Sequence, residues 1–82
     1  MNIQVLLFAG LAETAGASKI SLSFADEQVN VQAVRNELKN LLPNLEDLIE
    51  KSMVAVNQDY AANDFVISVG DEVALIPPVS GG

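Results

Sequence analysis

The pattern of apolar and polar positions along the first quarter of this chain predicts two strands joined by a short helical turn. Residues 3–9 are almost continuously apolar, which is typical of a central strand that is buried on both faces. Residues 19–25 alternate between apolar and polar and therefore predict a half-buried strand. Between them, residues 11–15 can form one helical turn that ends at Gly16.

The middle of the chain has the periodicity of an amphipathic helix. Asn30 is a good N-cap, and apolar residues follow it at helical spacing. Pro43 ends this helix, because the residue before a proline is pushed out of the α region. Asn44 can then cap a second, short helix over residues 45–51. The positions expected to face the core from the long helix are Val31, Val34, Leu38, Leu41 and Leu42.

The last third of the chain predicts shorter strands. Residues 53–57 and 72–76 are expected to form core strands, and a short strand over 60–62 follows a turn at 58–59. Residues 65–69 are apolar but irregular, and we assign them no element. The last strand ends where two prolines follow it, because neither can donate a hydrogen bond to a sheet ladder.

Two strands, a helix across one face and then further strands is the element order of a β-grasp, the ubiquitin-like fold. We therefore expect an α+β domain over residues 1–76, with a mixed sheet of about five strands packed against one long and one short helix. A right-handed crossover places the last strand parallel to the first, in the middle of the sheet. Residues 77–82 are expected to form a flexible tail.

Composition narrows the range of functions. The 82 residues include 11 acidic and four basic ones, with a net charge of −7, which argues against binding to nucleic acid or to an anionic membrane surface. The chain has no Cys and no His, so thiolate chemistry, an imidazole base and the usual zinc ligands are excluded. The N-terminal apolar run is too short to span a bilayer and follows no basic segment, so we expect a cytoplasmic protein.

The most informative part of the chain is its C-terminal segment, Pro77-Pro78-Val79-Ser80-Gly81-Gly82. The two prolines project it stiffly from a core strand, and the two glycines leave its tip thin and flexible. Such a tip can enter a narrow site on another protein. Because the chain has no Cys or His, the α-carboxylate of Gly82 is the best candidate for covalent chemistry, once another enzyme activates it as an acyl-adenylate.

Blocks of this sequence resemble the small subunit of molybdopterin synthase. The specific block runs from Gly70 to Gly82 and combines Gly-Asp-Glu-Val with Pro-Pro-Val-Ser-Gly-Gly; the others are Phe8-Ala9-Gly10-Leu11-Ala12-Glu13-Thr14-Ala15-Gly16 and Ala55-Val56-Asn57-Gln58. The resemblance covers nearly the whole chain. It implies a sulfur carrier that binds no cofactor of its own and works in a heterotetramer with the large subunit.

The resemblance also implies a mechanism. In that family, an ATP-dependent adenylyltransferase of the ubiquitin-activating type adenylates the terminal carboxylate, and sulfur then converts it to a thiocarboxylate. The tail enters the large subunit and gives its sulfur to cyclic pyranopterin monophosphate, which becomes molybdopterin. By position, Gly82 is the sulfur donor here, and Gly81 gives the tip access to the partner's site.

The family's contact surface for the large subunit maps by resemblance to Phe8, Tyr60 and Ile76. Ordinary core packing or isolated surface positions are the alternative explanation of these three apolar residues. The family commonly has a basic residue where this chain has Ala12, so a partner salt bridge is not carried over to that position.

Other functions share the terminal glycines. A sulfur carrier for the thiazole of thiamine uses the same chemistry with another large subunit, and a ubiquitin-like modifier is joined to lysines through the same carboxylate. A plain binding module, in which the tail has no role, is a further alternative. The Pro-Pro-Val-Ser sequence before the glycines favours the molybdopterin route over these.

Overall fold

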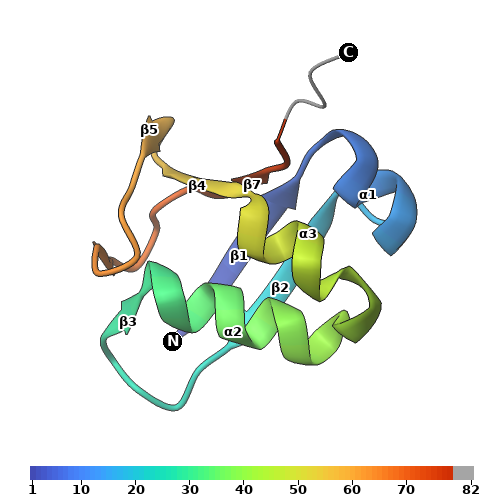
Figure 1. Ribbon diagram of the computed structural model, residues 1–82. Coiled ribbons are helices and arrows are strands. Elements are labelled where there is room, and N and C mark those ends of the chain that lie inside the picture. The colour runs from blue at the N-terminus through green and yellow to red at the C-terminus, as the bar shows by residue number, and fades with distance from the viewer. Residues whose placement is uncertain (79–82) are drawn as a thin grey trace.

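A mixed five-stranded sheet in the order β2-β1-β7-β4-β5 forms the centre of the computed structural model, which describes residues 1–78 (Figure 1). β1 and β7 are parallel neighbours, and every other pairing in this sheet is antiparallel. The last strand therefore lies beside the first in the middle of the sheet, as predicted. The strands are β1 (Asn2–Leu7), β2 (Lys19–Ser23), β4 (Met53–Val56), β5 (Asp59–Tyr60) and β7 (Val73–Ile76).

Two of the helices, α2 and α3, lie on the same side of this sheet, in front of β1 and β2 in the view of Figure 1. This arrangement confirms the predicted β-grasp. The sheet is mixed, and both the long and the short predicted helices are present. The helical elements are α1 (Ala9–Ala15), α2 (Val31–Leu41), the 3-10 turn η1 (Pro43–Leu45) and α3 (Glu46–Lys51).

The ends of α1 and α2 follow local signals. Gly16 closes α1 in the left-handed conformation at φ 75°, and its N–H donates to the carbonyl oxygen of Ala12. The side chain of Asn30 accepts a hydrogen bond from the N–H of Ala33 at 2.9 Å, which confirms the predicted N-cap of α2. Pro43 begins η1, directly after α2 has ended.

Two expectations about the helices are wrong. Asn44 does not cap the short helix, because it lies inside η1 and α3 begins at Glu46 without a side-chain cap. Leu41 is 51% exposed, although the spacing placed it in the core. It is the last residue of α2, and Leu42 packs against the core after the helix has ended.

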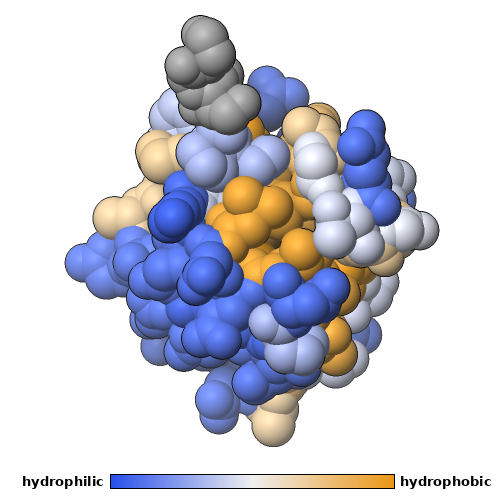
Figure 2. Space-filling view, turned by 45° about the vertical axis from the view of Figure 1, so that its right-hand side comes forward, coloured by the Kyte–Doolittle hydropathy of each residue, from blue (hydrophilic) through white to orange (hydrophobic). Residues whose placement is uncertain are grey.

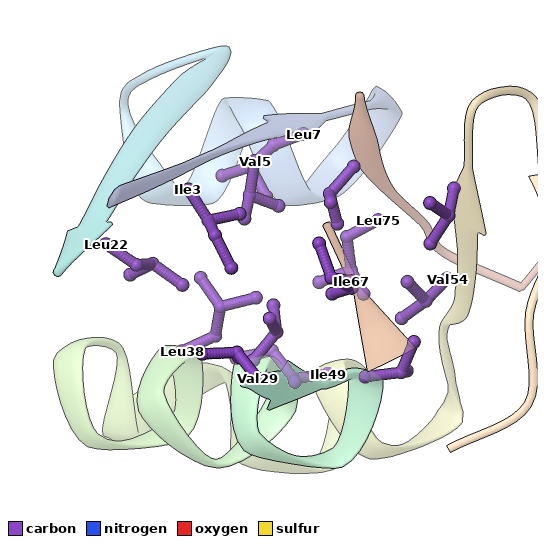
Figure 3. Close-up of a cluster of buried hydrophobic side chains, with 14 of the residues drawn as sticks. Ile3, Val5, Leu7, Leu22, Val29, Leu38, Ile49, Val54, Ile67 and Leu75 are labelled. Atoms are coloured by element: carbon purple, nitrogen blue, oxygen red, sulfur yellow. The ribbon is translucent and has the colours of Figure 1, made fainter. Parts of the chain in front are cut away.

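The hydrophobic core fills the space between the sheet and the α2–α3 layer (Figure 3). Alternate residues of each strand point into it, which is the period-two pattern that the sequence carries. On the helical side, Arg35 is also buried, at 8% exposure. The core side chains labelled in the figure are Ile3, Val5, Leu7, Leu22, Val29, Leu38, Ile49, Val54, Ile67 and Leu75.

A small second sheet escaped the sequence analysis. β3 (Val29–Asn30) and β6 (Val66–Ile67) pair antiparallel, and Ile67 is a buried core residue within the stretch that we left unassigned. The turn before β5 was also misplaced by one residue. Asn57 and Gln58 form it, with φ of 53° and 72°, so β5 begins at Asp59 rather than at residue 60.

The surface is largely hydrophilic, in keeping with the many acidic side chains. Turned by 45° from the view of Figure 1, it shows an apolar area in the middle that is bordered by hydrophilic residues (Figure 2). Within residues 1–78, no helix is both long enough and apolar enough to cross a membrane.

Candidate functional site

The sheet has a second face, turned away from α2 and α3, which we call the outer face. The strand registers place one transverse row of side chains on it, because facing residues of neighbouring strands point to the same side. This row crosses all five strands and consists of Lys19, Leu6, Ala74, Ala55 and Tyr60. Two adjacent alanines in its centre leave a depression between larger neighbours.

This depression is a cavity of about 340 Å³, which we call the outer hollow. Ala55 and Ala74 form its floor, and larger apolar and aromatic side chains surround them. Glu72 is the charged member of its lining. The complete lining is Leu6, Phe8, Ala55, Gln58, Tyr60, Glu72, Ala74 and Ile76.

All three residues predicted to contact a large subunit line the outer hollow. Phe8 follows β1 in extended backbone and is 47% exposed, while Tyr60 lies on β5 and is 68% exposed. Ile76 is the last residue of β7 and is half-buried. The structure thus gathers side chains that are far apart in the sequence, while their contact with a partner stays a prediction. Ala12, on α1, is half-buried and packs against the core instead.

The floor and one wall of the hollow are fixed by a hydrogen-bond network that the sequence analysis missed. The side-chain amide of Asn57 donates to Asp71 Oδ1 at 3.0 Å, and its oxygen accepts from the N–H of Glu72 at 2.9 Å. The backbone N–H of Asn57 also donates to the carbonyl oxygen of Glu72 at 2.7 Å. Asn57 thereby ties the β4–β5 turn, which leads to Tyr60, to the start of β7.

Asp71 is held in this network as a carboxylate. Its Oδ2 accepts from the N–H of Ser68 at 2.8 Å, and this bond, followed by the one from Asn57, lowers the pKa of Asp71 below its usual value. Asn57 belongs to one of the sequence blocks that carry the resemblance, and Asp71 belongs to another. Their pairing across 14 residues was the signal available, but only the fold shows that they meet.

A second polar cluster joins the helices and is structural in character. The buried Arg35 donates through Nε to Asn63 Oδ1 and through a terminal nitrogen to the carbonyl oxygen of Ile49, each at 2.8 Å. Nearby, Lys39 pairs with Glu50, and this hydrogen bond lowers the pKa of the Glu50 carboxyl. In the part of the chain that the structure describes, no three acidic side chains gather as a group that could hold a metal ion.

The C-terminal segment leaves the sheet at the edge of the outer hollow. Ile76 lines the hollow and is followed directly by Pro77, which is half-buried, and by Pro78, which is exposed. The predictions for Val79, Ser80, Gly81 and Gly82 fall outside the described residues. The predicted reactive terminus is thus at most six residues from the hollow along the chain.

Comparisons with known proteins agree on one family. The model of the ThiS family matches residues 5–82. A molybdopterin synthase sulfur carrier subunit from Dictyostelium discoideum is 39% identical over 99% of this chain and 96% of its own. The crystal structure of SAMP1 from Haloferax volcanii superposes with a TM-score of 0.86, at 32% identity and full coverage of both chains.

A third comparison involves an assembled protein. One chain of the complex of subunits 1 and 2 of the molybdopterin-converting factor from Helicobacter pylori superposes with a TM-score of 0.71. It covers all of both chains at 20% identity, so this likeness shows the fold.

Proposed function

The chain belongs to the ThiS family, among the sulfur carrier subunits of molybdopterin synthase, and from this premise we propose how it works. Gly82 carries sulfur as a C-terminal thiocarboxylate, and the outer hollow docks the chain on the large subunit of the synthase. The observation that carries this proposal is full-length similarity to curated sulfur carriers at 39% identity, combined with an apolar docking surface beside the C-terminal segment.

Each chemical step takes place on the terminal carboxylate. An adenylyltransferase of the ubiquitin-activating type lets a carboxylate oxygen of Gly82 attack the α-phosphorus of ATP, with release of pyrophosphate. A sulfide-level donor then displaces AMP from the acyl carbon and leaves the thiocarboxylate. The large subunit transfers this sulfur to cyclic pyranopterin monophosphate, and water restores the carboxylate of the carrier. The carrier itself needs no catalytic side chain for these steps, which suits a chain without Cys or His.

Docking and delivery are coupled by their proximity in the chain. Once the hollow holds the large subunit, the terminus is tethered next to the acceptor site, so the transfer becomes effectively intramolecular. A complex of the two subunits in the related Helicobacter pylori factor supports the choice of partner.

The experiment follows sulfur onto the terminus and off again. The chain is incubated with its adenylyltransferase, ATP and sulfide, and intact mass is expected to show one oxygen replaced by sulfur. The purified product, mixed with the large subunit and the precursor, is expected to yield molybdopterin. A chain lacking Gly82 is the control and is expected to do neither. Molybdopterin formation by that shortened chain would overturn the proposal.

A second candidate function is favoured by the likeness to SAMP1, a small archaeal modifier protein in a related structure. As a modifier, the activated carboxylate of Gly82 would form an isopeptide bond with a lysine amine of another protein. Adducts that survive a denaturing gel, and that disappear when Gly82 is removed, would support this role. A reconstituted synthase without such adducts would assign the chain to sulfur transfer alone.

A further inference from the structure

The outer hollow has the form of a socket for one side chain. Its floor consists of methyl groups, because Ala55 and Ala74 face each other across β4 and β7. Leu6 on β1 and Tyr60 on β5 stand on either side of this pair in the same transverse row. Apolar sockets of this kind are where binding hot spots gather, since a filled socket excludes water from the contact.

The lining of the socket carries one charge, that of Glu72. Glu72 follows Asp71, whose carboxylate is already occupied by Asn57 and the N–H of Ser68, whereas the structure gives the Glu72 side chain no hydrogen-bond partner within the described residues. Lys19 is the nearest cation in the transverse row, on the far side of Leu6 and outside the lining. The edge of the socket at Glu72 is therefore suited to a positively charged neighbour.

We infer that the socket receives a single large apolar side chain of the large subunit, flanked by a Lys or Arg that faces Glu72. This inference rests on the proposed function and adds to it the chemistry of the partner's contact. The anchor supplies most of the affinity, and the flanking cation sets the orientation in which the C-terminal segment points at the acceptor site. The surface is continuous with the start of that segment at Ile76, and the excess of acidic residues favours a basic partner.

The first test fills the socket from below. Ala74→Leu adds apolar volume on the floor but does not touch the core face of β7. We expect affinity for the large subunit to fall by about 30-fold, the loss typical of removing a hot-spot contact. The matched control is Ser21→Leu, which adds the same side chain to an exposed position of the outer face on β2, away from the lining. This control is expected to bind like the unmodified chain.

A second variant protects this test against misfolding. Leu6→Ala removes a wall of the socket rather than filling it, and it is also expected to weaken binding, by about tenfold. The unfolding midpoint of each variant is measured beside its affinity. If Ala74→Leu binds normally while folded, or if Ser21→Leu loses as much affinity, the socket is not the anchor site and the inference is overturned.

The charge is tested separately. Glu72→Lys is expected to weaken binding by at least about tenfold at low salt, while Glu72→Gln loses less and shows a weaker dependence on salt. Asp26→Lys makes the same change of net charge in an exposed loop and is expected to have a small effect. Equal losses for Glu72→Lys and Asp26→Lys would show that net charge alone acts, and would overturn the orienting role of Glu72.

These outcomes are distinct from a failure of the proposed function. If the chain lacking Gly82 still makes molybdopterin, the carrier function fails whatever the binding data show. If sulfur transfer depends on Gly82 but binding ignores Ala74 and Glu72, the carrier function stands and the socket inference alone is wrong. Both sets of measurements use the full chain and the large subunit of the same organism.

Discussion

Asn57 offers the sharpest test of how this fold holds its docking surface. Its side chain makes two hydrogen bonds, to the Asp71 carboxylate and from the N–H of Glu72, while its backbone lies in the left-handed region at φ 53°. Asn adopts that region more readily than most residues with a side chain. The replacements Asn57→Gly and Asn57→Ala separate the two roles, because both remove the hydrogen bonds but only Ala is strained at this φ.

The magnitudes follow from these contacts. Both hydrogen bonds are exposed to solvent, so each contributes about 0.5–1 kcal/mol, and Asn57→Gly is expected to lower the free energy of unfolding by about 1–2 kcal/mol. Left-handed backbone costs Ala about 1 kcal/mol more than Gly, so Asn57→Ala is expected to lose about 2–3 kcal/mol. For a domain of 82 residues, whose stability is typically about 4–12 kcal/mol, either loss is readily measured.

The assay is equilibrium unfolding in urea, combined with amide hydrogen exchange. The N–H of Glu72 loses its acceptor in both variants, so its exchange is expected to accelerate more than that of core strand amides. Asn57→Ala as stable as Asn57→Gly would refute the argument from backbone strain. Asn57→Gly with the stability of the unmodified chain would show that the network contributes nothing and does not hold the β4–β5 turn.

Further consequences can be measured on the same chain. Arg35→Met leaves Asn63 and a buried helix carbonyl without their donor, so unfolding in urea is expected to show a loss of about 2–4 kcal/mol. Because the pKa of Asp71 is lowered in the fold, its contribution to stability is complete above the usual value of 3.8 and is lost as the pH falls through the lower folded value. The stability gap to Asp71→Asn, followed by acid titration of unfolding, is therefore expected to shrink below that pH. Gly10→Ala, in a helix with open space around it, is expected to raise the thermal midpoint, whereas Gly16→Ala, at φ 75°, is expected to lower it by several degrees.

Elements that depend on local signals could be predicted from the sequence. The cap at Asn30, the helix end before Pro43 and the stop at Gly16 each act within a few residues, and the structure contains all three. The place of the last strand beside the first also followed, because right-handed crossover limits the possible topologies.

Features that depend on tertiary partners could not be predicted. A strand of two residues such as Val66–Ile67 is too short to show a period, and it forms only because Val29–Asn30 lies beside it. The burial of Arg35 depends on a carbonyl of another helix and on Asn63, 28 residues away. The floor of the hollow was also invisible, because an alanine within an apolar run has the same pattern as a core residue.

The candidate site came partly from resemblance and partly from the fold. Phe8, Tyr60 and Ile76 were proposed by their positions in the family, and the structure places all three around one cavity. Their partners in that cavity, Glu72 above all, were not proposed, since no spacing in the sequence links the turn before β7 to β1 or β5. The tertiary fold thus turned separate positions into a surface with a defined shape and charge.

The outer face also supports docking by an argument that needs no relative. Apolar residues on both sides of β1 and β7 led us to expect two covered faces, yet the helices α2 and α3 lie on only one. Val5 and Val73 point into the core and are fully buried, while their neighbours Leu6 and Ala74 line the open hollow and are only half-buried. Apolar surface left in water has a cost that folding of the described chain does not remove. A partner that covers the hollow removes it, so the same strands that build the core also provide the reason for association.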